Sequence, residues 1–325
     1  KAVEAVAILS GAASRSGSFD EALRYADMAL AIDSDSWMAW TNKTVALTHV
    51  GRLDEATDAA ARTMELARGV HAEPYVACGV LSVAKRDIPS AIRYYERAVD
   101  FPGAEADTIN YNLGCCLMIL NREMRRGWTH YELRWKLFDR VKQFMTHLNG
   151  IPMWDGRDLT GKRLLVFCEQ GVGDVIQQLR FIPDLRKKFN PATVCLEVQD
   201  NLGRVCRESA EFDNIVTRIV GMPYKHLPPV DFMASISSLP LLMGYSGLED
   251  VPKPEKYLSP LAGTRSPVPD DVWAASEGKL RVAISYAGAA IHSADQSRSV
   301  HLSRFKELMG PGVELFVVAR DTPER

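Results

Sequence analysis

The segment Gly17-Ser-Phe-Asp-Glu-Ala-Leu23 decides the fold of the amino-terminal half, because it recurs 34 residues later as Gly51-Arg-Leu-Asp-Glu-Ala-Thr57. A third copy follows after 35 residues and contains Arg86-Asp-Ile-Pro-Ser90. Equivalent positions in the three copies hold small residues, with one large exception, and these positions are Ala22, Ala26 and Ala29, then Ala56, Ala60 and Thr63, then Ala91, Tyr95 and Ala98. A fixed period of this length predicts a stack of helical hairpins.

A fourth copy begins as Asn112-Leu-Gly-Cys-Cys-Leu-Met-Ile-Leu-Asn121 and runs into Gly127-Trp-Thr-His-Tyr-Glu-Leu-Arg-Trp135. The array resembles the tetratricopeptide repeat, in which two antiparallel helices pack through small residues and a Gly or Asn closes the first helix. The resemblance implies about four hairpins over residues 1–140, stacked as a right-handed solenoid without a strand before Lys162. A protein or glycan partner is expected on the repeat face.

Composition excludes several functional classes. Thirty-nine Lys and Arg residues against 41 Asp and Glu residues give a net charge of -2, which lacks the basic excess of a nucleic-acid binder. The longest apolar runs are far shorter than the roughly 20 residues of a transmembrane helix. The six cysteines form no C-x-x-C pair, so we expect reduced core thiols, a cytoplasmic protein and no zinc site.

Basic residues are concentrated at the end of the repeats. Seven basic and three acidic residues lie between Arg122 and Lys142. A solvated helix face is the usual reason for such a run, and a surface for an anionic partner is the alternative.

The pattern changes after Gly150-Ile-Pro-Met-Trp-Asp-Gly156, from helical repeats to alternating strands and helices. We expect a buried strand at Lys162–Cys168, a helix at Asp174–Phe189 and a second strand at Thr193–Val198. Further strands are expected near Asn214–Val220 and Asp231–Ser235. Strand, helix and strand at this spacing predict a doubly wound parallel sheet.

A Pro-rich stretch separates this region from a last pair of expected strands, at Leu280–Tyr286 and Val313–Val318. The sheet that they begin is too short for a complete domain. The chain is therefore either a fragment or a protein with a degenerate last domain. The expected organisation is repeats over 1–140, a connector over 141–160, a Rossmann-like domain over 161–262, a Pro-containing linker over 263–278 and the start of a second Rossmann-like domain over 279–325.

The chemically informative segment is Glu169-Gln-Gly-Val-Gly-Asp174, between the first strand and its helix. Ligands of open parallel sheets bind beyond the carboxyl ends of the strands, and glycines there let the backbone approach a ligand. A dinucleotide fingerprint is one alternative, with Glu197 near the ribose-binding position, but Ile176 stands where that fingerprint needs a small residue. In a second alternative, Asp174 only caps the helix.

The stretch from Trp154 to Pro183, behind tetratricopeptide repeats, resembles bacterial repeat proteins that end in a heptosyltransferase-like glycosyltransferase domain with the two-Rossmann GT-B fold. The resemblance extends to Tyr131-Glu-Leu-Arg-Trp135, Leu196-Glu-Val-Gln199 and Val282-Ala-Ile-Ser-Tyr-Ala-Gly288, followed by His292 and Ser297-Arg-Ser299. It departs from the family at Tyr286-Ala-Gly-Ala-Ala290, where relatives usually have Trp-Ala-Gly-Asn-Pro.

The resemblance implies an inverting glycosyltransferase that uses a nucleotide sugar as substrate and needs neither a metal nor another cofactor. Asp174 matches the proposed catalytic base, and Arg298 matches a cation on the donor diphosphate. The other implied substrate or phosphate contacts are Gln170, Gly171, Gly173, Gly288, His292 and Ser297, with His301 as a further candidate. The alternatives are a non-catalytic repeat scaffold that retains a glycosyltransferase-like domain and, ranked below it, a nucleotide-dependent oxidoreductase.

Overall fold

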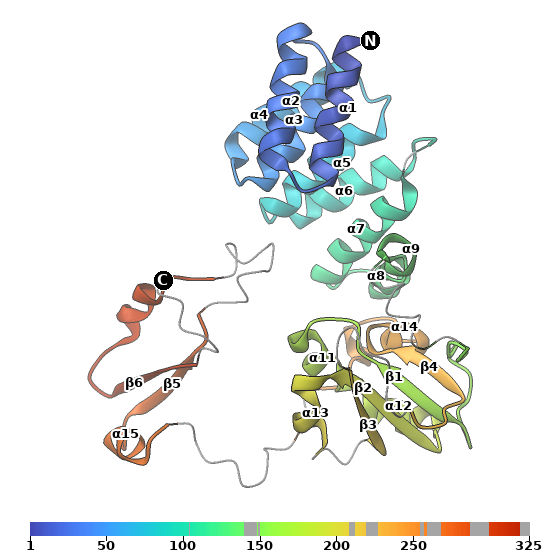
Figure 1. Cartoon of the computed structure of the whole chain (residues 1–325), viewed down its shortest axis with the longest axis vertical. Helices are drawn as coiled ribbons and strands as arrows, with labels where there is room; N and C mark the ends of the chain where they lie inside the picture. Colours follow the sequence, from blue (N-terminus) through green and yellow to red (C-terminus); the bar gives the residue numbers. More distant parts are fainter. Residues whose placement is uncertain are drawn as a thin grey trace. The chain divides into compact units, whose positions relative to one another are not determined.

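A computed structural model describes residues 1–103, 105–139, 148, 150–207, 212–218, 227–253, 257–258, 268–286 and 299–318. The chain divides into two units, Lys1–Pro260 and Leu261–Arg325. The first unit begins with antiparallel helix pairs (Figure 1). These helices are α1 (Ala2–Arg15), α2 (Phe19–Ile32), α3 (Trp37–His49), α4 (Leu53–Ala67), α5 (Ala72–Ala84), α6 (Ile88–Val99), α7 (Ala106–Ile119), α8 (Met124–Tyr131) and the short α9 (Arg134–Leu137).

The helix pairs confirm the helical repeats predicted from the 34-residue period. Gly17, Gly51 and Asn121 all follow first helices and have φ angles of 80°, 81° and 51°. Glycine and asparagine tolerate this left-handed conformation, which turns the chain into the second helix. In the third repeat Arg86 takes the same conformation, with φ of 61°. No strand occurs in the described residues of the repeat array.

The small-residue register is confirmed by burial. Ala22, Ala56 and Ala91 are equivalent, and each is 0% exposed. The third repeat places Tyr95 where the first two have alanine, and Gly79 on the paired helix leaves room for its ring. A Cβ atom at Gly79 would lie only 2.6 Å from Tyr95 Cε1. The large residue and the glycine therefore form a matched pair.

Ala56→Arg should lower the free energy of unfolding by roughly 3 kcal/mol or more, because it forces a long charged side chain into a filled contact between α3 and α4. Ala61→Arg is the matched control, because Ala61 lies on the exposed face of α4. The measurement is urea unfolding of both variants followed by circular dichroism. Equal unfolding midpoints would mean that the repeat register is wrong.

The second part of this unit is a four-stranded parallel sheet in the order β3-β2-β1-β4. Its strands are β1 (Arg163–Phe167), β2 (Thr193–Gln199), β3 (Asn214–Arg218) and β4 (Phe232–Ser235), as Figure 1 shows. The helices and 3-10 turns around it are α11 (Val172–Gln178), α12 (Phe181–Phe189), α13 (Asp200–Arg207), η2 (Ile236–Ser238), α14 (Leu239–Leu242) and η3 (Leu248–Asp250). The predicted parallel sheet is thus confirmed.

The expected helix over Asp174–Phe189 differs from the structure in two respects, because α11 begins at Val172 and the helix is broken between Gln178 and Phe181. Pro183 explains the break. Proline lacks an amide hydrogen, and its ring clashes with the carbonyl four residues earlier, so Pro183 is tolerated only in the first turn of a new helix.

The two faces of the sheet are packed by different residues, because side chains alternate along a strand. On one face, Leu164 and Val166 pack with α11 to α14 and with Trp128 of the last repeat hairpin. On the other face, Leu165 and Phe167 pack with a cluster that Trp135 joins. The last hairpin therefore contributes to the hydrophobic core on both sides of the sheet.

The second unit contains α15 (Asp270–Ala275), β5 (Leu280–Ile284), η4 (Leu302–Leu308) and β6 (Val313–Val317). The two strands pair in parallel, as the sequence predicts. Leu280 remains 66% exposed. Parallel strands are normally buried on both faces, and among the described residues this pair leaves Leu280 uncovered.

The thiols and charges follow the predictions from composition. All six cysteines are free, and five of them are buried. Burial raises the pKa of Cys78 to about 11, so its thiol stays protonated at neutral pH.

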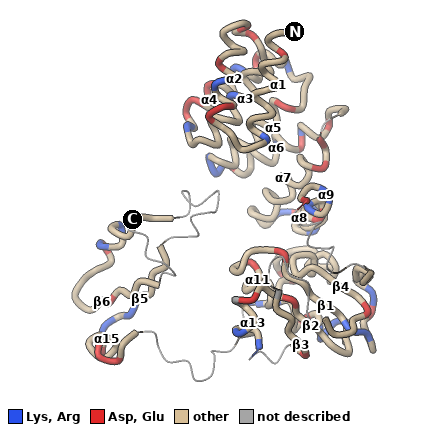
Figure 2. The backbone as a smooth tube through the Cα atoms, in the orientation of Figure 1, with Lys and Arg blue, Asp and Glu red and all other residues tan. Residues whose placement is uncertain are grey.

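Acidic and basic residues are interspersed along the helices and strands (Figure 2). Among the described residues, no helix combines the length and apolar character needed to cross a membrane.

Candidate functional site

The segment 169–174 lies beyond the carboxyl end of β1, where the sequence places the site. Gly171 is the N-cap residue of α11 and has an extended backbone conformation. A Cβ atom at Gly173 would meet nothing within 4 Å. Neither a left-handed backbone nor tight packing requires glycine at position 173, so the described structure leaves this part of the helix open to an approaching molecule.

Asp174 is exposed and occupies the first turn of α11. Its Oδ2 atom would lie 3.1 Å from a Cβ atom built on Gly171, so the carboxylate turns back over the loop. No side-chain hydrogen bond caps α11. The capping role weighed for Asp174 is therefore not observed, and the carboxylate is accessible from solvent.

Hydrogen bonds from residues at or after the ends of the neighbouring strands β2 and β4 hold the loop and α11. At the end of β2, the Gln199 Nε2 amide donates to the Gln170 carbonyl oxygen at 2.6 Å. After β4, the Ser237 hydroxyl donates to Gln178 Oε1 in α11 at 3.0 Å. These two contacts hold the start of the loop and the end of the helix that carries Asp174.

Glu169, the first residue of the loop, pairs with Arg134 from the last repeat hairpin, and each side chain is only 1% exposed. Arg134 Nη2 donates to Glu169 Oε1 at 3.1 Å and to Ser238 Oγ at 2.8 Å. Arg134 Nη1 donates to Glu132 Oε1 at 2.6 Å, and Ser235 Oγ donates to Glu169 at 2.7 Å. Every charge in this network has an opposite partner and hydrogen bonds, as burial requires.

Arg134 is an exception to the interpretation of the basic run as a solvated helix face, because Arg134 is buried whereas Arg122, Arg125 and Lys136 are exposed. Burial alone lowers its pKa, but the charges of Glu132 and Glu169 outweigh burial, and the net pKa is raised. Its guanidinium also lies 4.6 Å from the ring centroids of Tyr131 and Trp135. The sequence signal for this role was an arginine flanked by aromatic residues, which the basic count concealed.

Tyr131 is the last residue of α8, in the last repeat hairpin. Its ring stacks on Tyr111 with a centroid distance of 5.7 Å. Burial raises the pKa of Tyr131 to about 12, the charge of Arg134 opposes that shift, and the charges of Glu169 and Asp174 add to it. Tyr131 thus contacts Tyr111 of α7, and its pKa responds to the charges of Arg134, Glu169 and Asp174.

The structure argues against dinucleotide binding, because Glu197 is not available to bind a ribose. Glu197 is 0% exposed, and its Oε2 atom accepts the Cys168 backbone N–H at 3.2 Å. Its carboxylate therefore serves the join between β1 and β2 and is not presented to a ribose. Ile176 packs against the hydrophobic core, where the dinucleotide fingerprint would need a small residue.

Four of the predicted contacts, Gly288, His292, Ser297 and Arg298, lie outside the described residues. His301 is described, and its Nδ1 atom lies 2.7 Å from Ser303 Oγ and accepts the Ser303 backbone N–H at 3.2 Å. This histidine therefore caps η4 in the structure. Within the described residues, no group of three His, Cys, Asp or Glu side chains is arranged to hold a metal ion.

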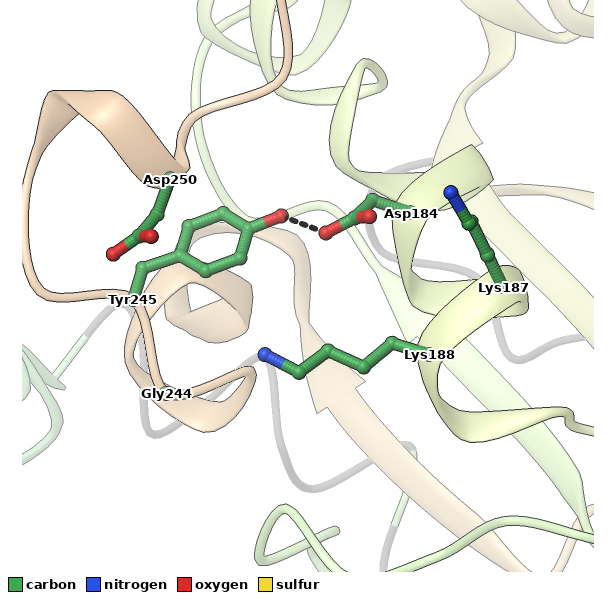
Figure 3. Close-up of a pocket in the computed structure, with 6 residues that line it drawn as sticks. All are labelled: Asp184, Lys187, Lys188, Gly244, Tyr245 and Asp250. Atoms are coloured by element: carbon green, nitrogen blue, oxygen red, sulfur yellow. Dashed lines mark hydrogen bonds between the residues drawn. The ribbon is translucent and has the colours of Figure 1, made fainter.

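A pocket of about 350 Å³ lies on a different part of the first unit. Figure 3 shows the residues that line it, which are Asp184, Lys187, Lys188, Gly244, Tyr245 and Asp250. The Tyr245 hydroxyl donates to Asp184, and Lys188 Nζ donates to the Met243 carbonyl oxygen at 2.6 Å. Because α12 runs back toward the start of β2, this pocket lies away from the carboxyl ends of the strands. We attribute it to packing between α12 and the segment after α14.

Comparisons with known proteins extend these observations. No family model matches the chain. Protein FlbA of Caulobacter vibrioides is 31% identical over 108 residues, which cover 32% of this chain and 17% of FlbA. The match therefore spans only a small part of the curated relative.

Similar solved structures contain helical repeats. An O-GlcNAc transferase mutant from Thermobaculum terrenum is 17% identical, covers 68% of this chain and 42% of its own, and gives a TM-score of 0.36. MamA from Desulfovibrio magneticus is 18% identical, covers 44% and 76%, and gives a TM-score of 0.31. PilF from Pseudomonas aeruginosa is 15% identical, covers 45% and 68%, and gives a TM-score of 0.36. Similarity at this level does not fix a function, and the fold rests on the helix pairs and the parallel sheet themselves.

Proposed function

We propose that this protein is an inverting glycosyltransferase of the GT-B type, which moves a sugar from a nucleotide-sugar donor to a protein or glycan acceptor held by the repeat array. The observation that carries the proposal is the exposed Asp174 carboxylate, placed beyond the carboxyl end of β1 on a loop fixed by its neighbours. In this proposal the Rossmann-like domain over 161–262 binds the acceptor, and the one that begins at 279 binds the donor.

The proposed reaction needs one base and a site for departing charge. Asp174 accepts the proton of the acceptor hydroxyl as its oxygen attacks the anomeric carbon. The bond between that carbon and the donor phosphate breaks, and the nucleoside diphosphate leaves with the electron pair. Gln170, Gly171 and Gly173 contact the acceptor side, while Gly288, His292, Ser297 and Arg298 hold the diphosphate, so neither a metal nor another cofactor is required.

The second candidate is a repeat scaffold with a glycosyltransferase-like domain that no longer catalyses transfer. It is favoured by the Tyr286-Ala-Gly-Ala-Ala290 sequence, which lacks the Asn and Pro of the family. In both candidates the repeats bind a partner protein or glycan. The free, buried thiols fit a cytoplasmic location.

Donor binding separates the two candidates. The full-length protein is titrated with a panel of nucleotide sugars by calorimetry, and release of nucleoside diphosphate is then followed with candidate acceptors. The glycosyltransferase predicts saturable binding of one donor and acceptor-dependent release. If no nucleotide sugar binds, the scaffold replaces it as the proposed function.

A further inference from the structure

The Tyr131 hydroxyl has no hydrogen-bond partner within the part of the chain that the structure describes. The polar side chains that follow it in the sequence are all paired. Glu132 accepts hydrogen bonds from Arg134 Nη1 at 2.6 Å and from Trp135 Nε1 at 2.9 Å. Arg134 also donates to Glu169. The hydroxyl of Tyr131 is therefore the polar group of this segment that the buried network does not use.

Two contacts hold the ring that carries this hydroxyl. Tyr111 of α7 stacks on the Tyr131 ring with an angle of 23° between the planes. The guanidinium of Arg134 lies 4.6 Å from the ring centroid. The hydroxyl of Tyr111 differs from that of Tyr131, because it is bonded to the Cys115 side chain. The Tyr131 ring is thus fixed in place, and its hydroxyl is left to bind another molecule.

Tyr131 lies close to the loop that carries Asp174. The guanidinium that contacts its ring also donates to Glu169 Oε1 at 3.1 Å, and Glu169 is the first residue of that loop. Burial and the negative charges of Glu169 and Asp174 all raise the pKa of Tyr131, against the charge of Arg134. The hydroxyl therefore stays protonated at neutral pH and is available as a hydrogen-bond donor.

The loop itself offers no ready partner for this donor. Tyr131 is half-buried, and a hydroxyl partly removed from water costs free energy unless it is hydrogen-bonded. Glu169 is already bonded to Arg134 and Ser235. An oxygen atom of a molecule bound beside Asp174 would complete the hydrogen bonding of Tyr131.

We propose that Tyr131 is a substrate-binding residue, whose hydroxyl donates a hydrogen bond to an oxygen of the acceptor next to the hydroxyl that Asp174 deprotonates. Because Tyr131 belongs to α8, the acceptor site then includes a side chain of the last repeat hairpin. The inference rests on the proposed function and adds a residue to its acceptor side.

Tyr131→Phe in the full-length protein is the test, because phenylalanine keeps the ring and its contacts but lacks the hydroxyl. We expect the KM for the acceptor to rise about 3-fold to 10-fold, which is the usual effect of losing one uncharged hydrogen bond. The kcat and the KM for the donor should change by less than about twofold, since the bond is made equally in the ground state and the transition state. The Tm should stay the same, because no hydrogen bond within the protein is lost.

Tyr111→Phe is the matched control, because it removes a hydroxyl that is already bonded within the protein. It should lower the Tm and leave the KM for the acceptor unchanged. The opposite pattern, with a lower Tm for Tyr131→Phe and an unchanged KM, would show that Tyr131 is only structural.

A second measurement does not require sugar transfer. The full-length protein carries 3-fluorotyrosine at Tyr131 and is mixed, without donor, with serine- and threonine-containing peptides or with oligosaccharides. We expect one of the two classes of acceptor to shift the fluorine NMR signal. The same label at Tyr25 of α2 should not respond, because its hydroxyl is bonded to Glu21.

The two measurements separate failure of this inference from failure of the proposed function. Transfer that proceeds with an unchanged acceptor KM in Tyr131→Phe would overturn the inference and leave the enzyme. If no nucleotide sugar binds but the signal at Tyr131 shifts, the enzymatic function is wrong and Tyr131 still binds the partner. A signal at Tyr131 that neither peptides nor oligosaccharides shift would overturn the inference in either case.

Discussion

Replacing Asp174 with Asn should reduce the rate constant for sugar transfer by about 100-fold to 10,000-fold, which is the usual contribution of a general base. Asparagine has nearly the same size but cannot accept the acceptor proton at neutral pH. The exposed side chain makes no capping hydrogen bond, so the free energy of unfolding should change by less than about 0.5 kcal/mol. Transfer kinetics and thermal unfolding of the same variant measure both effects.

Asp158→Asn provides the matched control, because Asp158 is an exposed aspartate outside the candidate site. It should retain full transfer activity. If the Asp174 variant transfers sugar as fast as the unmodified protein, Asp174 is not the base. A variant that loses activity together with stability would instead indicate a structural role for this carboxylate.

Arg134→Met should lower the free energy of unfolding by about 3–5 kcal/mol, because it leaves Glu169 buried without its partner. The hydrogen bonds of Arg134 to Glu132, to Ser235 at the end of β4 and to Ser238 are lost with it. Urea unfolding, followed separately by circular dichroism and by tryptophan fluorescence, measures the loss. We expect both probes to report it, since Trp135 adjoins the network.

Arg126→Met is the control within the same basic run. Arg126 also pairs with two glutamates, Glu96 and Glu123, but its side chain is 38% exposed. Exposed ion pairs stabilise proteins by at most about 1 kcal/mol, so the control should remain close to the unmodified protein. The double variant with Arg134→Met and Glu169→Met should recover part of the stability, because no charge is then left buried alone. Equal effects of the two single variants would contradict the buried network.

Local patterns were sufficient to predict most of the fold. Ala22, Ala56 and Ala91 are buried in contacts between helices that are neighbours in sequence. Their burial therefore follows from the repeat period alone. The strands β1 and β2 were predicted from continuous apolar runs, which parallel strands require because both faces are buried. In the same way, the loop and Asp174 follow from the order of strand, glycine and helix.

The features that sequence reasoning missed depend on distant partners. Arg134 is separated by 35 residues from Glu169 and by 104 from Ser238, and both partners lie outside the repeat array, so the repeat pattern does not predict these contacts. The aromatic residues near Arg134 in the sequence, Tyr131 and Trp135, are a local signal, but they do not identify Glu169 and Ser238 as its partners. The break before α12 could have been predicted from the sequence, because Pro183 disfavours a continuous helix at this point. The helical spacing of the apolar residues on both sides of Pro183 concealed this.

The packing of the last hairpin against the sheet limits where repeats can be gained or lost. Hairpins near α1 contact mainly their neighbours, so gain or loss of whole repeats there changes the length of the array without disturbing the sheet. The last hairpin is different, because Trp128 and Trp135 complete the hydrophobic cores on the two faces of the sheet and Arg134 neutralises Glu169. A gene fusion or domain transplant with its boundary after this hairpin would leave a buried carboxylate without its cation. The functional unit of exchange is therefore the sheet together with α7, α8 and α9.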